Sequence, residues 1–340
     1  MRDLAAKIGV SRATVSMALR NHPRLSEETR KRVQAEAAKL GYKPNALVSA
    51  LMTQVRGRQL NRSGEVLAFL TAYTEKEEWQ GAPTVRACFE GARTQAEQLG
   101  YRLEPYWLGP LGAHSAQVSR TLRARAVRGS ILAPVPLDLG PVDLRWGSNL
   151  VVAIGYSFRQ QALHRVTHNQ FNGMLTCYER LRALGHKRIG LAMHREADER
   201  VHHYWMAGFY TGRQVHGGAS VPMLFQGDWH NRPQDRVQFL DWFAKNTPDA
   251  IIGILPDLPL KWLKAEGVKV PSDVSYAGLD LDSSQVGKVA GVRQHSESIG
   301  AAAVDLVAGG LQRNDLRLPA HPQLIHLDGE WCEGQSMAAR

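Results

Sequence analysis

The stretch GVSRATVS at Gly9–Ser16 decides how the amino-terminal part of this chain folds. Gly9 supplies the positive φ that a tight turn requires, and Val10 can fill the angle between two helices. Ser11 is a natural N-cap for a helix over 12–19. That helix has an apolar stripe at i, i+3 and i+4, made of Val15, Ala18 and Leu19. The stretch therefore predicts a tight turn followed by a short amphipathic helix.

Two further short helices are expected on either side of this one. Residues 2–8 predict the first, with an inward face of Leu4, Ala5 and Ile8. Ser26 is the N-cap of the third, which Gly41 ends. We expect the inner face of the third helix to consist of Val33, Ala37 and Leu40. Three short helices with a glycine turn between the first two form a helix-turn-helix, whose second helix enters the major groove of DNA.

The charge of the chain is concentrated at this end. Of the net charge of +10, residues 1–63 carry +9, because 13 lysine and arginine residues face only four acidic residues there. The other 277 residues are almost neutral. A basic module beside a neutral body is typical of a protein that binds a polyanion.

The body alternates short apolar runs with amphipathic stretches. Strands are predicted over 66–71, 102–107, 130–133, 150–154, 188–193, 221–225, 250–254, 273–277 and 323–327. Helices are predicted over 84–99, 115–125, 172–184, 199–216, 232–245, 258–266 and 295–312. This β-α alternation favours an α/β fold with two doubly wound, parallel-sheet lobes. In such lobes a ligand binds at the carboxyl ends of the strands.

Three blocks of the head occur together: Gly9–Ser16, LSEETR at Leu25–Arg30 and LGYKPNA at Leu40–Ala46. At this spacing they resemble the signature of the lac repressor (LacI/GalR) family of transcription regulators. The resemblance continues through the body in three islands, which read FEGA at 89–92, LGHKRIG at 184–190 and GVKVPSDVSYAGLD at 267–280. It implies two lobes of the periplasmic-binding-protein-like type.

The resemblance also implies how the chain is divided. Residues 1–44 are expected to form the helix-turn-helix DNA-binding domain, 45–63 a hinge helix and linker, and 64–340 a two-lobed domain for effector binding and dimerisation. Lobe 1 is expected at about 64–157 and 292–320, and lobe 2 at about 158–291 and 321–340.

Specific roles on DNA follow from the same resemblance. Arg12 and Ala13 match the pair of residues that reads bases, since an arginine binds guanine and an alanine contacts only the thymine methyl group. Met17 matches a third reading position that is usually polar or basic, so the preferred operator is left open. The positions expected to contact DNA are Ser11, Arg12, Ala13, Thr14, Ser16, Met17, Asn21, Thr29, Asn45 and Leu51. Among them, the candidates for phosphate contacts, which position the protein without reading sequence, are Ser11, Thr14, Ser16, Asn21 and Thr29.

The segment after Pro44 matches the hinge helix of the family. Leu51 stands where the family inserts a leucine between base steps of the minor groove. The segment is too short and too β-branched to be a stable helix alone, so we expect it to fold when it pairs with its twin on DNA. The alternative is a plain linker that happens to contain a leucine.

An effector site between the lobes is the next implication. Asp280 matches an acidic residue that accepts hydrogen bonds from ligand hydroxyls, and Trp229 matches an aromatic wall. Trp205 and Gly155 replace an arginine and an aspartate of the family, which favours a neutral, stackable ligand such as a carbohydrate. The expected effector-binding residues are Tyr73, Trp205, Trp229, Asp280 and Gln294. Core packing is the alternative role for both tryptophans.

Other chemistries find little support in the sequence. It contains no G-x-G-x-x-G, no G-x-x-x-x-G-K-[ST] and no G-x-S-x-G motif, so we expect no enzyme and no cofactor. His164 with His168, and His202 with His203, lack the partners of a metal site. Cys88, Cys177 and Cys332 are widely spaced, which favours free thiols.

We therefore expect a transcription regulator, most simply a repressor, whose partners are double-stranded operator DNA, a small-molecule effector and a second copy of the chain. Residues 329–340 contain no leucine heptad, which favours a dimer over a tethered tetramer. The apolar runs are too short for a membrane helix, and we expect a cytoplasmic, nucleoid-associated protein. Two alternatives stay open: an architectural DNA-binding protein that senses nothing, and a sugar-modifying enzyme fused to a DNA-binding head.

Overall fold

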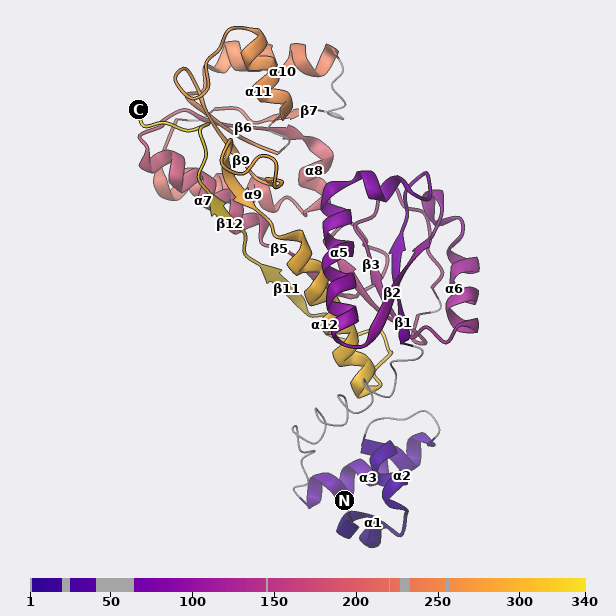
Figure 1. Ribbon diagram of the computed structural model, residues 1–340. Helices are drawn as coiled ribbons and strands as arrows, with labels where there is room; N and C mark the ends of the chain where they lie inside the picture. The colour runs from indigo at the N-terminus through magenta and orange to yellow at the C-terminus, as the bar shows by residue number, and fades with distance from the viewer. Residues whose placement is uncertain are drawn as a thin grey trace. The chain divides into compact units, whose positions relative to one another are not determined.

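Three short helices form the amino-terminal head: α1 (Arg2–Ile8), α2 (Arg12–Leu19) and α3 (Glu27–Lys39) (Figure 1). The computed structural model describes residues 2–19, 25–40, 64–144, 146–219, 221–226, 233–254 and 257–340. All three helices predicted for the head are present. The fold class expected from the sequence is thereby confirmed for its first part.

A small apolar core holds these helices together. Val15, Ala18 and Val33 are fully buried, and Ala5 and Ala37 are nearly so. Each helix contributes to this core, so burying one apolar stripe fixes all three helices relative to one another.

One expectation for the head is wrong. The side chain of Leu40 is 46% exposed and does not complete the inner face of α3. The helix ends at Lys39, and Leu40 is its C-cap residue with φ −83° and ψ 4°. Leu40 therefore no longer follows the helical repeat that places Val33 and Ala37 inward.

The chain divides into two units. Unit 1 comprises Met1–Ile154, Gln160–Arg165 and Gly300–Gln323. Unit 2 comprises Gly155–Arg159, Val166–Ile299 and Leu324–Arg340.

The first sheet has six strands in the order β11-β5-β4-β3-β1-β2. They are β1 (Glu65–Thr71), β2 (Tyr101–Trp107), β3 (Gly129–Leu132), β4 (Leu150–Ile154), β5 (His164–His168) and β11 (Leu324–Leu327). The strand β1 pairs in parallel with both β2 and β3, and β3 pairs in parallel with β4. Because β1 lies between β2 and β3, the chain reverses its winding direction at β1, which is the switch point of a doubly wound sheet.

Helices cover both faces of this sheet (Figure 1). One face carries α5 (Pro83–Gln98) and α12 (Ser296–Arg313), and the other carries α6 (Ser115–Ala124). The turns η1 (Glu78–Gly81) and η2 (Pro110–Gly112) follow β1 and β2. The helices α5 and α12 approach so closely that a Cβ atom on Gly300 would lie 1.9 Å from the backbone oxygen of Cys88.

The second sheet also has six strands, in the order β12-β10-β9-β8-β6-β7. They are β6 (Ile189–His194), β7 (Leu224–Gln226), β8 (Ala250–Gly253), β9 (Ser275–Gly278), β10 (Ala290–Arg293) and β12 (Glu330–Cys332). The pairs β6–β7, β6–β8, β8–β9 and β9–β10 are parallel, while β12 runs antiparallel to β10. Its helices are α7 (Gln170–Ala183), α8 (Arg195–Arg200), α9 (Tyr204–His216), α10 (Pro233–Asn246) and α11 (Asp257–Ala265).

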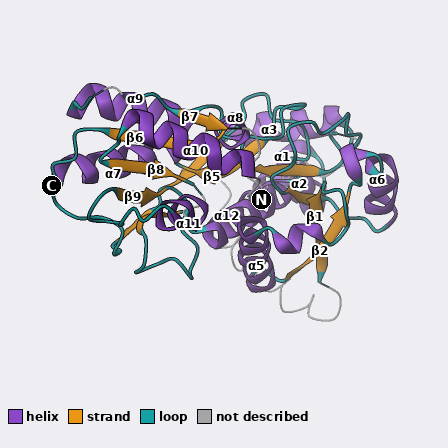
Figure 2. Ribbon diagram, turned by 90° about the horizontal axis from the view of Figure 1, so that it is seen from above, coloured by secondary structure: helices purple, strands orange, loops and turns teal. Residues whose placement is uncertain are grey.

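The second sheet separates two apolar cores. Ile189, Leu191 and Met193 of β6 belong to the core that α7 and α9 cover. Ala192 of the same strand belongs to the core on the other face, with Phe239 of α10 and further residues of α11. Successive side chains of a strand point to opposite faces, so a strand buried on both sides must have helices on both sides (Figures 1 and 2).

The predicted strands and helices agree with the structure, with four differences. The strands β5, β10 and β12 were not among the predictions, because runs of three to five residues with polar or glycine positions carry no clear period. The predicted helix over 199–216 is wrong as one element, since it divides into α8 and α9. His202 and His203 stand between these helices with φ of 54° and 61°, which no α-helix accommodates.

Among the residues that the structure describes, no helix has both the length and the apolar content needed to cross a membrane.

A buried histidine at the end of β5 should make the folded state sensitive to pH. His168 is 1% exposed and packs against Gly173 and Gly329, and burial lowers the pKa of its imidazole to about 4. Between about pH 6.5 and pH 4 the unfolded chain binds this proton and the folded chain does not, so stability falls as the pH decreases through this window. We expect this residue alone to cost roughly 2 kcal/mol at pH 5 relative to pH 7.

Urea denaturation of the full chain and of a His168→Asn variant at both pH values measures this effect. The variant should be less stable at pH 7, but its loss between pH 7 and pH 5 should be smaller than that of the original chain. Burial also lowers the pKa of His186, so part of the pH dependence will remain in the variant. An equal loss in both proteins would contradict the assignment.

Candidate DNA interface and effector site

The helix α2 begins at a side-chain cap. The Oγ atom of Ser11 accepts a hydrogen bond from the backbone N–H of Thr14 at 3.0 Å, and the two hydroxyl groups lie 2.9 Å apart. This cap satisfies one of the open N–H groups of the first helical turn. Ser11 is therefore the N-cap that the sequence predicts, and the predicted base-reading positions Arg12 and Ala13 are the first two residues of the helix.

Two contacts fix the angle of α2 within the head. Gly9 adopts φ 72° between α1 and α2, and the N–H of Val10 donates to the oxygen of Ala5 at 3.1 Å. At the other end of α2, Nε2 of Gln34 donates to the oxygen of Ala18 at 2.9 Å. The turn and this side-chain bond hold α2 between α1 and α3, which is the arrangement that a reading helix requires.

The start of α3 repeats the capping pattern. The Oγ atom of Ser26 accepts from the N–H of Thr29 at 3.3 Å, and their hydroxyl groups are 2.8 Å apart. Ion pairs follow along the helix, from Lys31 to Glu27 at 2.8 Å and from Lys7 of α1 to Glu36 at 3.1 Å. The hydrogen bond from Lys7 lowers the pKa of Glu36. The cap at Ser26 thus fixes the position of Thr29, a predicted phosphate contact.

The structure places the other predicted DNA contacts as follows. Thr14 and Met17 are half-buried on α2, and Ser16 lies in the same helix. Asn21, Asn45 and Leu51 lie outside the described residues, as does the whole predicted hinge at 45–63. Their roles on DNA stay predictions.

Three predicted effector residues follow directly on parallel strands. Tyr73 stands two residues after β1, Asp280 two residues after β9, and Gln294 one residue after β10. The structure brings two of them together in unit 2, because Nε2 of Gln294 donates to the backbone oxygen of Leu279 at 3.1 Å. The carboxyl edge of doubly wound sheets is where ligands bind, so these positions suit the predicted role.

The other two expected effector residues are the tryptophans Trp205 and Trp229. Trp205, in the first turn of α9, is 6% exposed and belongs to the apolar core of unit 2. Its Nε1 atom is buried and has no hydrogen-bond partner among the residues that the structure describes. Trp229 lies outside the described residues. Core packing thus accounts for the burial of the Trp205 ring but not for its indole N–H.

Sequence reasoning missed an aromatic cluster in unit 2. Tyr156 follows β4 by two residues, and its hydroxyl lies 2.6 Å from Nε2 of His326. Its ring centroid is 5.1 Å from that of His202 and 5.3 Å from that of Tyr204. The position of Tyr156, directly after the apolar run 150–154, is the signal that would have pointed to it.

A second aromatic group lies in unit 1 at the ends of β1 and β2. Nε1 of Trp107 donates to the backbone oxygen of Tyr73 at 2.9 Å, and its ring meets His114 edge to face at 4.8 Å. Trp107 is the last residue of β2. The hydrogen bond from Trp107 thus holds the loop that carries Tyr73 next to the half-buried indole ring of Trp107.

Gly155 stands where the resemblance leads us to expect an aspartate. It adopts φ 73°, a conformation that L side chains rarely take. Its N–H donates to the oxygen of Val166 at 2.9 Å. A Cβ atom here would have open space, so the backbone conformation and not crowding favours glycine.

The histidines weighed as metal ligands have other contacts. The Nδ1 atom of His164 accepts from the N–H of Gln323 at 2.9 Å, and Nδ1 of His203 lies 2.8 Å from a carboxylate oxygen of Asp198. In the described part of the chain, no three histidine, cysteine or acidic side chains are grouped so as to hold a metal ion.

A helix-turn-helix head followed by two doubly wound α/β units defines the class of this protein as a DNA-binding transcription regulator. Residues 1–45 match the family described as bacterial regulatory proteins, lacI family, and residues 178–337 match the periplasmic binding protein-like domain. The head of this chain is therefore similar to the DNA-binding head of the lacI family of bacterial regulatory proteins. The resemblance inferred from the three blocks of the head is confirmed.

Known proteins share this organisation over most of the chain. The HTH-type transcriptional repressor CytR of Escherichia coli (strain K12) is 26% identical over 300 residues, which cover 84% of this chain and 81% of CytR. Among solved structures, the complex of the transcriptional regulator CelR with cellobiose has a TM-score of 0.61 at 20% identity and covers 98% of both chains. The lac repressor dimer bound to operator and the anti-inducer ONPF has a TM-score of 0.63 at 19% identity, covering 99% of this chain and 98% of that one. The two structures share the fold.

The cap of α2 allows stability and DNA contact to be separated. A Ser11→Asp substitution keeps a good N-cap, because aspartate caps as well as serine, so the head should stay folded. The new negative charge next to a backbone phosphate should lower DNA affinity about tenfold. Ala35→Glu adds the same charge at an exposed position of α3 and serves as the control. Thermal unfolding and fluorescence anisotropy with duplex DNA measure the two effects, and equal affinities for both variants would rule out a phosphate contact at Ser11.

Proposed function

We propose that this protein is a homodimeric, sequence-specific repressor whose affinity for its operator changes when a neutral carbohydrate binds to its two-lobed body. The observation that carries the proposal is the capped helix α2, held in a helix-turn-helix head that precedes two doubly wound units. The head supplies binding to DNA, and the match of 178–337 to the periplasmic binding protein-like domain supports a body that binds a small molecule.

Repression and dimerisation are supported by the relatives. CytR is described as a repressor, and the lac repressor structure is a dimer on its operator. A two-fold dimer places two heads on a pseudo-palindromic site, which doubles the number of bases read. We propose that 1–44 binds DNA, that 45–63 forms the hinge, and that ligand binding biases the pairing of two hinges. Such coupling between two sites typically amounts to about 1–3 kcal/mol.

A carbohydrate suits the polar groups at the strand ends. Asp280 and Gln294 offer hydrogen-bonding groups of the kind that bind sugar hydroxyls, while Tyr156 and Tyr204 of the same unit supply aromatic rings for stacking. The buried indole N–H of Trp205 is a donor that a ligand oxygen would satisfy. CelR, a structural neighbour, was solved with cellobiose.

An enzyme with the same head is the second candidate. It predicts turnover of the ligand, whereas the repressor proposal predicts that the ligand is recovered unchanged after incubation. An architectural protein predicts that no small molecule alters DNA binding. The relatives are transcription regulators, which favours reversible binding.

The reading role of Arg12 leads to a prediction about sequence choice. We expect selection from randomised duplexes to yield a two-fold symmetric site, and Arg12→Ala to relax the choice of one base per half-site at a cost of about 1–3 kcal/mol in discrimination. Arg32→Ala, at an exposed position of α3, should weaken binding to all sequences alike and lower its dependence on salt. A selection from which the original chain yields no preferred sequence would overturn the proposed function.

The role of Trp205 in ligand binding can be separated from core packing. Trp205→Phe retains a ring but removes the N–H donor, so we expect roughly a threefold to tenfold loss of carbohydrate affinity, the value of one hydrogen bond. Trp262→Phe, in the other core of unit 2, is the matched control for lost volume. Titration calorimetry with cellobiose, glucose and ribose measures both variants. Equal losses would show that Trp205 acts only through the core, and binding of anions but of no neutral sugar would overturn the choice of ligand.

A further inference from the structure

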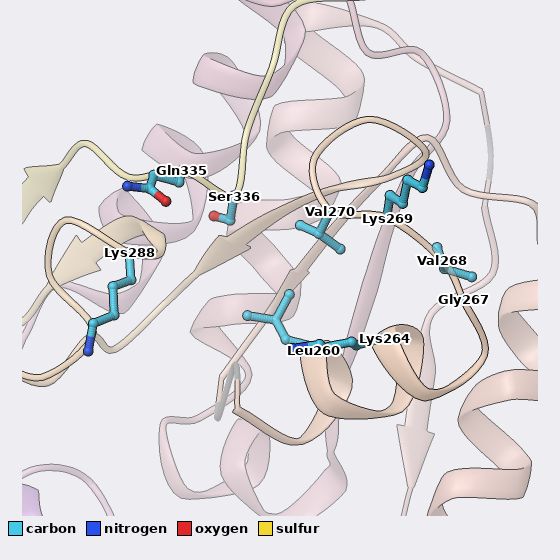
Figure 3. Close-up of a pocket in the computed structure, with 9 residues that line it drawn as sticks. All are labelled: Leu260, Lys264, Gly267, Val268, Lys269, Val270, Lys288, Gln335 and Ser336. Atoms are coloured by element: carbon cyan, nitrogen blue, oxygen red, sulfur yellow. The ribbon is translucent and has the colours of Figure 1, made fainter.

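A pocket lies in unit 2 at the amino end of β9, opposite the strand ends that carry Asp280 and Gln294 (Figure 3). Its volume is about 520 Å³, within the range of small-molecule sites. Four stretches of chain form its walls: the helix α11, the loop at 267–270, the turn at Lys288, and the chain at Gln335 and Ser336. The pocket is thus distinct from the proposed carbohydrate site.

The floor of the pocket is apolar. Leu260, Val268 and Val270 line it and pack from outside against the core that contains Trp262 and Tyr276. In Figure 3 the side chains of Leu260 and Val270 face the hollow from two sides. A ligand with an apolar body would remove this surface from water, a gain of roughly 25 cal/mol per Å².

The rim of the pocket is cationic. Lys264, Lys269 and Lys288 line it, and all three are exposed. Among the residues that the structure describes, no carboxylate oxygen lies within 4.0 Å of any of these three ammonium groups. Figure 3 shows Lys264 extended alongside Leu260, whereas the ammonium groups of Lys269 and Lys288 turn away from the hollow on opposite sides.

The acidic groups nearby are already engaged. A carboxylate oxygen of Asp273 accepts the backbone N–H of Lys269 at 2.8 Å, and Glu266 pairs with Arg236. Asp282 bonds Ser284, which lowers the pKa of Asp282, and the charge of Lys288 acts in the same direction. Each of these carboxylates thus has its own hydrogen bonds or ion pair, and within the described chain none forms an ion pair with a lysine of the rim.

The helix dipole accounts for only one of the three lysines at the rim. Lys264 lies in the last turn of α11, where a cation interacts favourably with the helix dipole. Lys269 and Lys288 lie on other segments, where this reason does not apply. Three like charges around an apolar hollow repel one another, and an anion bound among them would relieve this repulsion.

We propose that this pocket binds a small organic anion with an apolar body, such as an aromatic or aliphatic carboxylate, as a second ligand of the protein. The apolar floor takes the body of the molecule, and Lys264, which lies beside Leu260, binds its anionic group, while Lys269 and Lys288 add positive charge at the rim. Hydrogen bonds of Gln285, in the turn that precedes Lys288, connect the pocket helix α11 with the segment that follows Asp280. Asp282 N–H donates to Oε1 of Gln285 at 3.2 Å, and Nε2 of Gln285 donates to Asp257 at the start of α11 at 2.9 Å.

The experiment compares matched probes on the full chain. Calorimetry or ligand-detected NMR with 2-naphthoate and with its neutral counterpart 2-naphthamide should show the anion binding at least about tenfold more tightly, a difference of about 1.4 kcal/mol. Octanoate and phenyl phosphate extend the probes to an aliphatic body and a different anionic group. If none of the three anions binds at about 1 mM, the proposal is overturned.

Three variants locate the binding site. Lys264→Glu should lower naphthoate affinity at least about tenfold, while the double variant Lys269→Glu with Lys288→Glu should lower it less, because both of these ammonium groups point away. Lys261→Glu, exposed on the same helix α11 but outside the pocket, is the control and should leave affinity unchanged. An equal effect of the control, or equal binding of the amide, would overturn the proposal. DNA binding and sugar binding are measured separately, so failure here leaves the proposed repressor function untouched.

Discussion

Burial of parallel strands on both faces is the constraint on which the body of this protein depends. In the second sheet, Leu191 and Ala192 are neighbours in sequence but belong to different apolar cores. Neither face can meet water, so helices cover both, and α7 with α9 lies opposite α10 with α11. What remains accessible is the two edges where strands begin and end. Both ligand sites proposed for this protein lie at such edges.

The two edges of unit 2 differ in chemistry. The carboxyl edge carries Asp280 and Gln294 and lies in the same unit as the aromatic group around Tyr156. The amino edge carries an apolar hollow with a lysine rim. Hydroxyl-rich neutral molecules suit the first set of groups, and amphipathic anions suit the second. One turn at 282–288 connects the segment of Asp280 with Lys288 through the hydrogen bonds of Gln285.

The head follows a different physical logic from the body. Its core consists of small residues such as Ala5, Ala18 and Ala37, which bury little area each. Local interactions therefore matter more: the caps at Ser11 and Ser26, the glycine turn at Gly9, and the bond from Gln34 to Ala18. These features are encoded within a few residues of one another, except for the last, which joins two helices across 16 positions.

The sequence by itself determined the features that depend on near neighbours. The caps at Ser11 and Ser26, the helices of the head and the long alternating segments of the body all arise from local periodicity and turn chemistry, and they are found as expected. Tertiary structure decided whatever depends on distant partners. Three short strands form because a neighbouring strand completes their hydrogen bonds, and His202 and His203 take a left-handed conformation that divides one expected helix into two. The cluster around Tyr156 and the lysine pocket consist of residues from segments far apart in the chain, so no local pattern of apolar or charged residues predicts them.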